Sequence, residues 1–150
     1  MQNKQVRLYN VLFPLWFLMI FPVTWLIVLP GNFLIDSLVL IVALRALKMD
    51  DRKTWYKRHI LPVFGFGMLA DVIGAAFLFL MMVLEVYDIQ RELWLTIPAL
   101  LISAVLIFVF NYFVTFRRAE KPLRLRLALT FAIVTAPYTF LVPSGWLYGF

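Results

Sequence analysis

Two acidic side chains lie inside long apolar runs, where their chemistry is out of place. Asp36 follows the Pro30-Gly31 pair, and Asp71 lies near the middle of the run that begins at Ile60. An acid at the centre of a membrane helix costs about 2.5–3.5 kcal/mol on insertion scales, so such a residue is a functional-site hypothesis by default. A carboxyl group there can transfer protons, bind a cation or form a hydrogen bond with a neighbouring helix.

No basic residue is placed to pair with Asp71 within the apolar core. Arg45 lies at the inner end of its run, nine residues from Asp36, and therefore on the opposite face of a helix. We expect Asp71 to be protonated at neutral pH, or else to face water or a bound cation.

Asn111 is a third polar candidate, in the inner third of a later apolar run. The sequence predicts Asp36 near the outer edge of the bilayer, Asp71 near the midplane and Asn111 nearer the inner surface. Such a staggered track would serve proton or cation movement if the three side chains converge. The alternative is that Asp71 makes one interhelical hydrogen bond, which contributes about 1 kcal/mol.

Small residues surround Asp71 at helical spacing and predict a helix-packing face. Gly67, Asp71, Gly74 and Ala75 fall at i, i+4, i+7 and i+8, and Ala70 lies close by. Small side chains at this spacing let a second helix approach closely. We therefore expect Asp71 to point toward another helix and not toward lipid.

Other chemistry is poorly represented, and we expect neither an enzyme nor a bound cofactor or metal. The chain has no cysteine and one histidine, His59, which excludes thiol chemistry and a multi-histidine metal site within one chain. An intramembrane aspartyl hydrolase is a remote alternative. It needs two carboxyls at similar depth, and Gly65-Phe66-Gly67 is not the Gly-x-Gly-Asp arrangement of the intramembrane aspartyl proteases.

The composition identifies the environment of these residues. Of the 150 residues, 64% are hydrophobic and 15% are charged, and the mean hydropathy is +0.92. Soluble domains are about 45–50% apolar and about 25% charged. The chain is therefore an all-α integral membrane protein and neither a soluble domain nor a disordered chain.

Apolar runs bounded by charges or by Pro-Gly predict a bundle of five spans. Leu8 to Leu47 is almost continuously apolar and would be about 60 Å long as one helix, twice the hydrocarbon thickness. It must fold back, and Pro30-Gly31 is expected to form the turn of a tight helical hairpin. The spans lie at about 8–29, 32–47, 60–84, 94–116 and 127–147, in one domain with no extramembrane domain.

Charge supports this topology. Arg91 is the exception among the 14 Lys and Arg residues, because the others lie in alternate connections. The positive-inside rule then places the N-terminus inside and the C-terminus outside. A net charge of +6 is explained by orientation, so we expect no nucleic acid. The expected contacts with anionic lipid or a partner at the inner surface are Arg52, Lys53, Lys57, Arg58, Arg117 and Arg118.

Two functions remain open. The first is a non-catalytic membrane subunit or accessory protein that acts through helix packing, in the plasma membrane (the inner membrane of a bacterium). The alternative is a small transporter or channel for protons, cations or a small solute that uses Asp71 and Asp36. Five helices are few for an enclosed pathway, so transport implies a homo-oligomer. Either function predicts self-association or a membrane partner.

Overall fold

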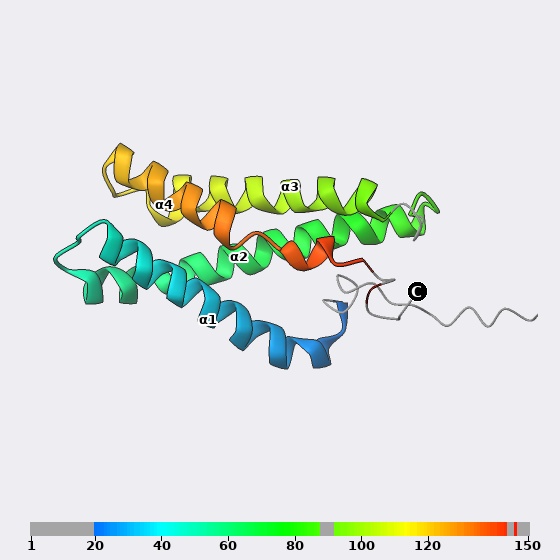
Figure 1. Ribbon diagram of the computed structural model, residues 1–150, viewed down its shortest axis with the longest axis horizontal. Helices are drawn as coiled ribbons and strands as arrows, with labels where there is room; N and C mark the ends of the chain where they lie inside the picture. Colours follow the sequence, from blue (N-terminus) through cyan, green and yellow to red (C-terminus); the bar gives the residue numbers. More distant parts are fainter. Residues whose placement is uncertain (1–19, 88–91, 144–145, 147–150) are drawn as a thin grey trace, which may run out of the picture.

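The computed structural model describes residues 20–87, 92–143 and 146, and these residues form helices and no strand (Figure 1). Three helical segments are long and apolar enough to cross a membrane. They are α1 (Pro22–Ala46), α2 (Arg52–Val83), and α3 (Leu93–Phe110) with its π-helical continuation η3 (Asn111–Thr115). A shorter helix, α4 (Lys121–Val134), and a 3-10 turn, η4 (Tyr138–Leu141), follow.

The predicted hairpin at Pro30-Gly31 is wrong, because α1 runs through both residues as one helix. Pro30 removes one backbone hydrogen bond, whereas a turn in an apolar setting would leave several backbone groups without partners. At about 1.5 Å per residue, the 25 residues of α1 reach about 37 Å, enough to cross the hydrocarbon core. α1 therefore continues without a turn from the end of the first predicted span, 8–29, through nearly all of the second, 32–47. Residues 1–19, and with them the predicted location of the N-terminus, lie outside the described residues.

The later spans agree better with the prediction. α2 contains nearly all of the predicted span 60–84 and begins earlier, and α3 with η3 matches 94–116 closely. The last predicted span, 127–147, is interrupted, because α4 ends at Val134 and η4 begins at Tyr138. Pro137 explains the break, since it has no amide hydrogen and disfavours helical geometry at the residue before it.

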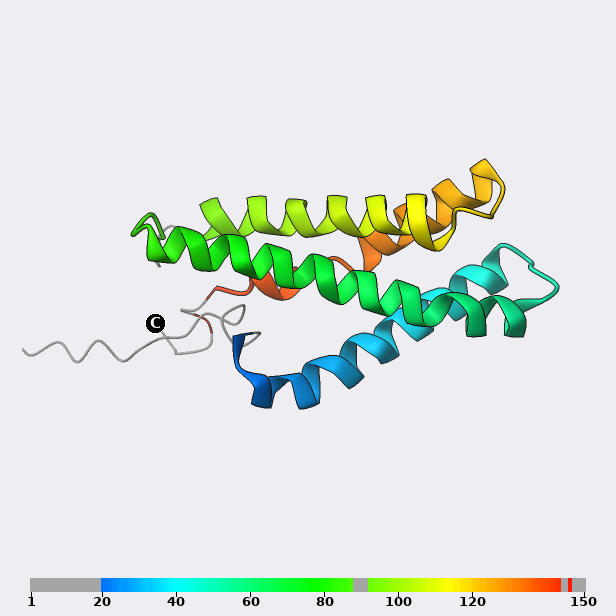
Figure 2. The same cartoon turned by 180° about the vertical axis from the view of Figure 1, so that it is seen from behind.

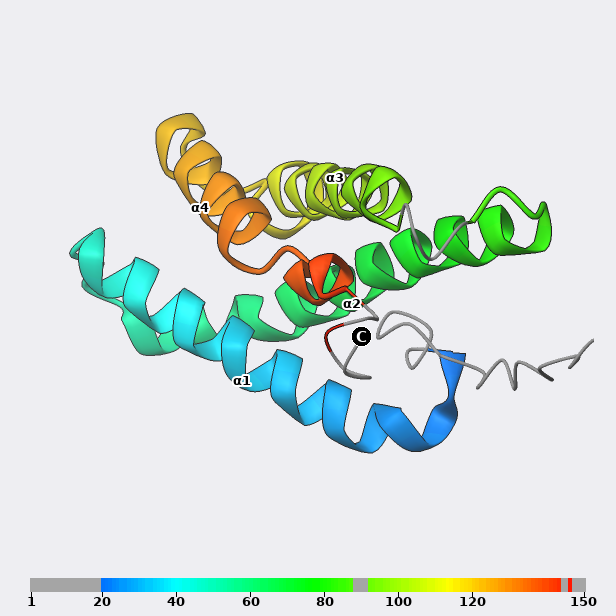
Figure 3. The same cartoon turned by 45° about the vertical axis from the view of Figure 1, so that its right-hand side comes forward.

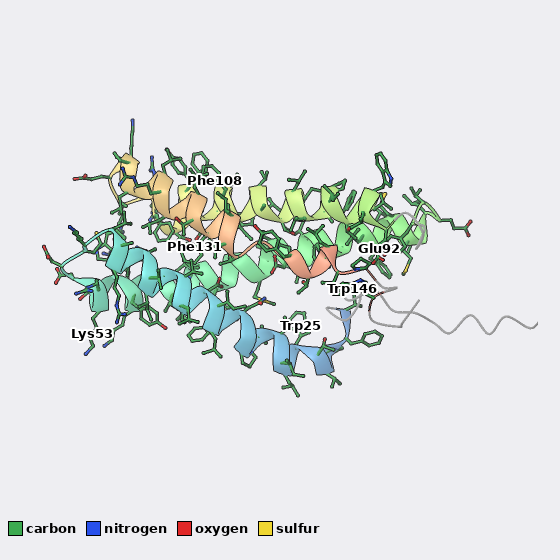
Figure 4. The ribbon with its side chains drawn as sticks, viewed as in Figure 1. Trp25, Lys53, Glu92, Phe108, Phe131 and Trp146 are labelled. Carbon is green, nitrogen blue, oxygen red and sulfur yellow. The ribbon has the colours of Figure 1, made fainter. Side chains whose placement is uncertain are left out.

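The helices run antiparallel in sequence order, with α2 between α1 and α3 (Figures 1 and 2). The α1–α2 and η3–α4 connections lie at the same end of the bundle, and the α2–α3 connection lies at the other. Figure 4 shows Lys53 at the first end and Trp25, Glu92 and Trp146 toward the second. We call the first the basic end; its cationic side chains include Arg52, Lys53, Lys57, Arg58, Arg117 and Arg118.

The bundle is packed unevenly along its length. Near the basic end, α1, α2, α3 and α4 share one core that includes Leu44, Val63, Ile107 and Phe131. Toward the other end a smaller cluster joins only α2, α3 and η4, and the first half of α1 diverges from α3 (Figure 3). This divergence leaves space beside α2 at the level of the two acids.

Candidate functional site

A cavity of about 480 Å³ lies between α1, the middle of α2 and the break after α4. Both intramembrane acids, Asp36 and Asp71, line it. The other lining residues are Thr24, Ile27, Val28, Gly31, Asn32, Ile35, Gly67, Met68, Val134, Thr135, Ala136, Pro137, Tyr138 and Thr139.

One continuous face of α1 forms the first side of the cavity. Thr24, Val28, Asn32 and Asp36 are spaced by four residues, which places them along one helical stripe. This stripe exists because α1 continues through Pro30; a turn there would have separated Thr24 from Asp36.

The second side is a short stretch of α2 that approaches α1 closely. The Asp36 carboxyl oxygen Oδ2 lies 3.6 Å from the position that a Cβ on Gly67 would occupy. Asn32 Nδ2 lies 3.0 Å from Met68 Sδ, and Asp71 follows Gly67 by one helical turn on the same face. The absence of a side chain at Gly67 therefore leaves room for the Asp36 carboxyl.

The third side is the interrupted helix between α4 and η4. Thr135 Oγ1 donates a hydrogen bond of 2.8 Å to the Phe131 carbonyl oxygen, and the Tyr138 hydroxyl donates to the carbonyl oxygen of Ile133. A hydroxyl that donates its proton in this way still presents lone pairs as an acceptor. These two hydroxyl groups therefore offer acceptors to the cavity and not donors.

The ionisable side chains that line the cavity are acidic. Asp36 and Asp71 are only 5% and 6% exposed. No lining residue is basic, and Asp71 Oδ1 has no hydrogen-bond partner within the part of the chain that the structure describes. A buried ionised carboxylate without a partner is costly, so protonation, water in the cavity or a bound cation would each stabilise these carboxyls.

The predicted order of depth is wrong. Asp36 lies opposite Gly67, and Asp71 is one turn, about 6 Å, farther from the basic end along α2. Asp36 is therefore the acid nearer the basic end. The prediction placed it at the outer edge because it assumed a turn at Pro30-Gly31. The two acids still lie about one helical turn apart along the bundle, so the objection to an aspartyl pair from unequal depth stays, and so does the mismatch to the Gly-x-Gly-Asp arrangement.

Asn111 does not join the acids. It is fully buried where α3 passes into η3, and its Nδ2 donates a hydrogen bond of 2.9 Å to the Ile107 carbonyl oxygen. It does not line the cavity. The structure therefore brings Asp36 and Asp71 together and leaves Asn111 at a separate position.

The small residues of α2 divide between two neighbours. Gly67 lies against α1, whereas Ala70, Gly74 and Ala75 are buried in contacts with other elements. Ser103 on α3 donates a hydrogen bond of 3.0 Å to the Ala70 carbonyl oxygen. A Cβ on Gly74 would overlap the Ser103 hydroxyl and would lie 2.9 Å from the Phe140 ring and 3.2 Å from the Ala99 carbonyl oxygen.

Sequence reasoning missed one residue of the cavity that it had the means to find. Asn32 directly follows the predicted turn at Pro30-Gly31, and it precedes Asp36 by four residues and shares its helical face. That spacing is the signal of a polar pair on one helix.

The basic residues separate into groups. Arg58, Arg117 and Arg118 line a pocket between α2 and the η3–α4 connection. Arg52 and Lys53 line a second depression against α1, and Lys57 lines neither.

Comparison with known proteins adds no assignment, since no family model, no curated protein and no solved structure matches this chain. No cluster of three or more metal-ligating side chains occurs within residues 20–87 and 92–143. Function must therefore be argued from the acid cavity and the basic end.

Proposed function

We propose that this protein is a small membrane transporter or channel that carries a proton, a monovalent cation or a small cationic solute, with Asp36 and Asp71 as its binding groups. One observation carries the proposal: two buried carboxyls share a cavity, and none of the described residues that line it is basic. Intramembrane acids with this character are typical of proton relays and ion pathways.

The composition of the cavity supports a positively charged cargo. A proton or cation offsets the cost of burying the carboxyls, whereas an anion would increase it. The Thr135 and Tyr138 hydroxyls already donate to backbone carbonyls and so present acceptors. A volume of about 480 Å³ leaves room for a hydrated ion or a small organic cation.

The interrupted helix supports movement of the cargo. Non-helical backbone at membrane depth is tolerated where it lines a cavity, and discontinuous helices form the binding sites of many transporters. Here the break from Thr135 to Pro137 forms one side of the acid cavity. Backbone carbonyls freed by the break would add oxygen ligands.

The topology and assembly are part of the same proposal. The positive-inside rule places the basic end at the cytoplasmic face of a bacterial inner membrane, with a multi-pass chain and the C-terminus outside. On the side toward α3, the first half of α1 diverges from the bundle and faces the acid cavity and the break after α4 (Figure 3). We expect a second copy of the chain to close the pathway on that side.

Ion flux in proteoliposomes tests the proposal. Wild type is compared with Asp36→Asn and Asp71→Asn, read with proton- and potassium-sensitive dyes under an imposed gradient. Each isosteric change is expected to lower flux at least about tenfold, a loss of 1.4 kcal/mol or more in binding or barrier. Asp50→Asn, which removes an exposed acid at the basic end, is the matched control and should leave flux unchanged.

A second candidate, the non-catalytic membrane subunit, is favoured by the closed contact between α2 and α3 around Gly74. That contact is built for close packing and contains no ionisable group. Absence of proton and cation flux in the wild type, with the protein folded and inserted, would favour this candidate. Wild-type flux in both Asp variants would contradict the transport role of the acids.

A further inference from the structure

We propose that the basic end contains a phosphate-binding pocket, separate from the acid cavity and independent of the transport proposal. The pocket has a volume of about 330 Å³ and lies between the first turns of α2 and the segment that joins η3 to α4. Arg58, Arg117 and Arg118 line it, so three arginine residues from two separate segments border one space.

Packed aromatic rings form one side of the pocket. Trp55 and His59 lie one turn apart on α2 and stack with ring centroids 4.6 Å apart. His59 also lies 5.4 Å from the Phe116 ring and is only 8% exposed. Its Nδ1 donates a hydrogen bond of 2.8 Å to the Trp55 carbonyl oxygen, which leaves Nε2 for another partner. The pocket is thus a formed cavity with a buried polar ring, not a loose group of surface lysines.

The three arginine side chains are free to bind. None of them has a salt bridge or hydrogen bond to another group in the part of the chain that the structure describes. The one acid in the lining is Asp51, so positive charge is in excess. Thr115 Oγ1, also in the lining, is a buried hydroxyl without a hydrogen-bond partner among the described residues.

A fourth arginine holds the pocket together and is not available to a ligand. Arg124 on α4 lies over the Tyr112 ring, 4.2 Å from its centroid, and Nη2 donates to the Tyr112 hydroxyl at 3.2 Å. Its Nη1 contacts the Arg117 carbonyl oxygen at 3.4 Å. Arg124 therefore supports the turn that presents Arg117 and Arg118.

Phosphate fits this arrangement better than a carboxylate or a simple halide. Guanidinium groups bind phosphate oxygens through paired hydrogen bonds, and several arginines can share its oxygens. Trp55 and Tyr112 are of the kind that marks a membrane interface, where lipid phosphates lie. The phosphate can therefore belong to an anionic lipid headgroup or to a soluble phosphate.

Electron paramagnetic resonance of spin-labelled lipid tests the pocket in the full chain. The protein is reconstituted in phosphatidylcholine vesicles with spin-labelled phosphatidylglycerol, and the immobilised fraction gives the relative affinity. Arg117→Gln with Arg118→Gln is expected to lower that affinity at least about fivefold. Lys57→Gln with Lys121→Gln removes the same charge at the same end but outside the pocket, and should change it less than about twofold.

Two further measurements separate binding in the pocket from misfolding and from diffuse attraction to lipid. Asp51→Asn removes the acid from the lining and is expected to raise the affinity about threefold, which a misfolded protein would not do. Inorganic phosphate added to the wild type should leave the bound lipid in place if a headgroup is the ligand, and should displace it if the ligand is soluble phosphate. Equal losses in the two double variants, or no gain in Asp51→Asn, would overturn the pocket and indicate diffuse attraction to anionic lipid.

Discussion

Gly67 and Gly74 lie two turns apart on α2, and their surroundings are opposite. Around Gly74 the space is closed, because Ser103, Phe140 and the Ala99 backbone meet the position of a missing side chain. Around Gly67 the Asp36 carboxyl is the only described group outside the helix's own backbone within 4 Å of the missing side chain, and the space beyond opens into the acid cavity. The small residues of α2 therefore allow close packing against α3 at Gly74 and leave room for the Asp36 carboxyl at Gly67.

The difference arises from the partner helix and not from α2. α3 presents Ala99 and Ser103, small residues that let two backbones approach until a serine hydroxyl bonds a main-chain carbonyl. α1 presents Asn32 and Asp36, whose polar groups find few partners across the gap. The helices pack closely where both present small side chains. A cavity forms where one helix presents polar side chains and diverges from the other.

The largest expected effect is on the closed side. Gly74→Ala places a Cβ against the Ser103 hydroxyl and the Ala99 backbone, and is expected to lower the free energy of unfolding by about 2–3 kcal/mol. The measurement is a denaturant titration in detergent micelles. Gly65→Ala on the same helix is the control, because among the described residues nothing outside the helix's own backbone lies within 4 Å of its Cβ position. Similar losses in both variants would contradict a special contact at Gly74.

An intermediate effect is expected on the open side. In Gly67→Val the first added carbon meets Asp36 at ordinary contact distance, but the branched methyls crowd the carboxyl and the mouth of the cavity. We expect flux to fall about tenfold while the free energy of unfolding changes by less than about 1 kcal/mol. A variant with normal flux would show that this part of the cavity lies off the pathway.

The smallest effect is expected from the hydrogen bond between the helices. Ser103→Ala removes the bond to the Ala70 carbonyl oxygen and is expected to cost about 0.6 kcal/mol, with flux unchanged. The same titration measures it. A loss of flux would instead couple the α2–α3 contact to the acid cavity.

Much of the fold could be read from residue types. The apolar runs predicted the end of α2, and both ends of α3 with η3, to within one residue. The start of α2 was missed, because the helix begins at Arg52 and not at residue 60. The small residues around Asp71 predicted a packing face, and the structure places Ala70, Gly74 and Ala75 in such contacts. The prediction of the helices succeeded because hydropathy acts locally along one segment.

The turn at Pro30-Gly31 could not be decided in this way. Local chemistry favours a turn there, and the overall apolar length of Leu8–Leu47 predicted one. In the described structure the helix starts only at Pro22, so the length from Pro22 to Ala46 fits a single crossing. The order of Asp36 and Asp71 along the bundle was wrong for the same reason.

Composition and periodicity alone show that this chain is helical, apolar enough to enter a membrane, basic in two connections and acidic at two positions within its apolar runs. They suffice for these properties because each depends on residues close together in the chain. Tertiary packing, in contrast, brings Asp36 and Asp71 into one cavity, leaves Asn111 apart, and places Arg58, Arg117 and Arg118 around one pocket. Helical spacing sets the face of each residue on its own helix, whereas packing between helices sets which faces meet.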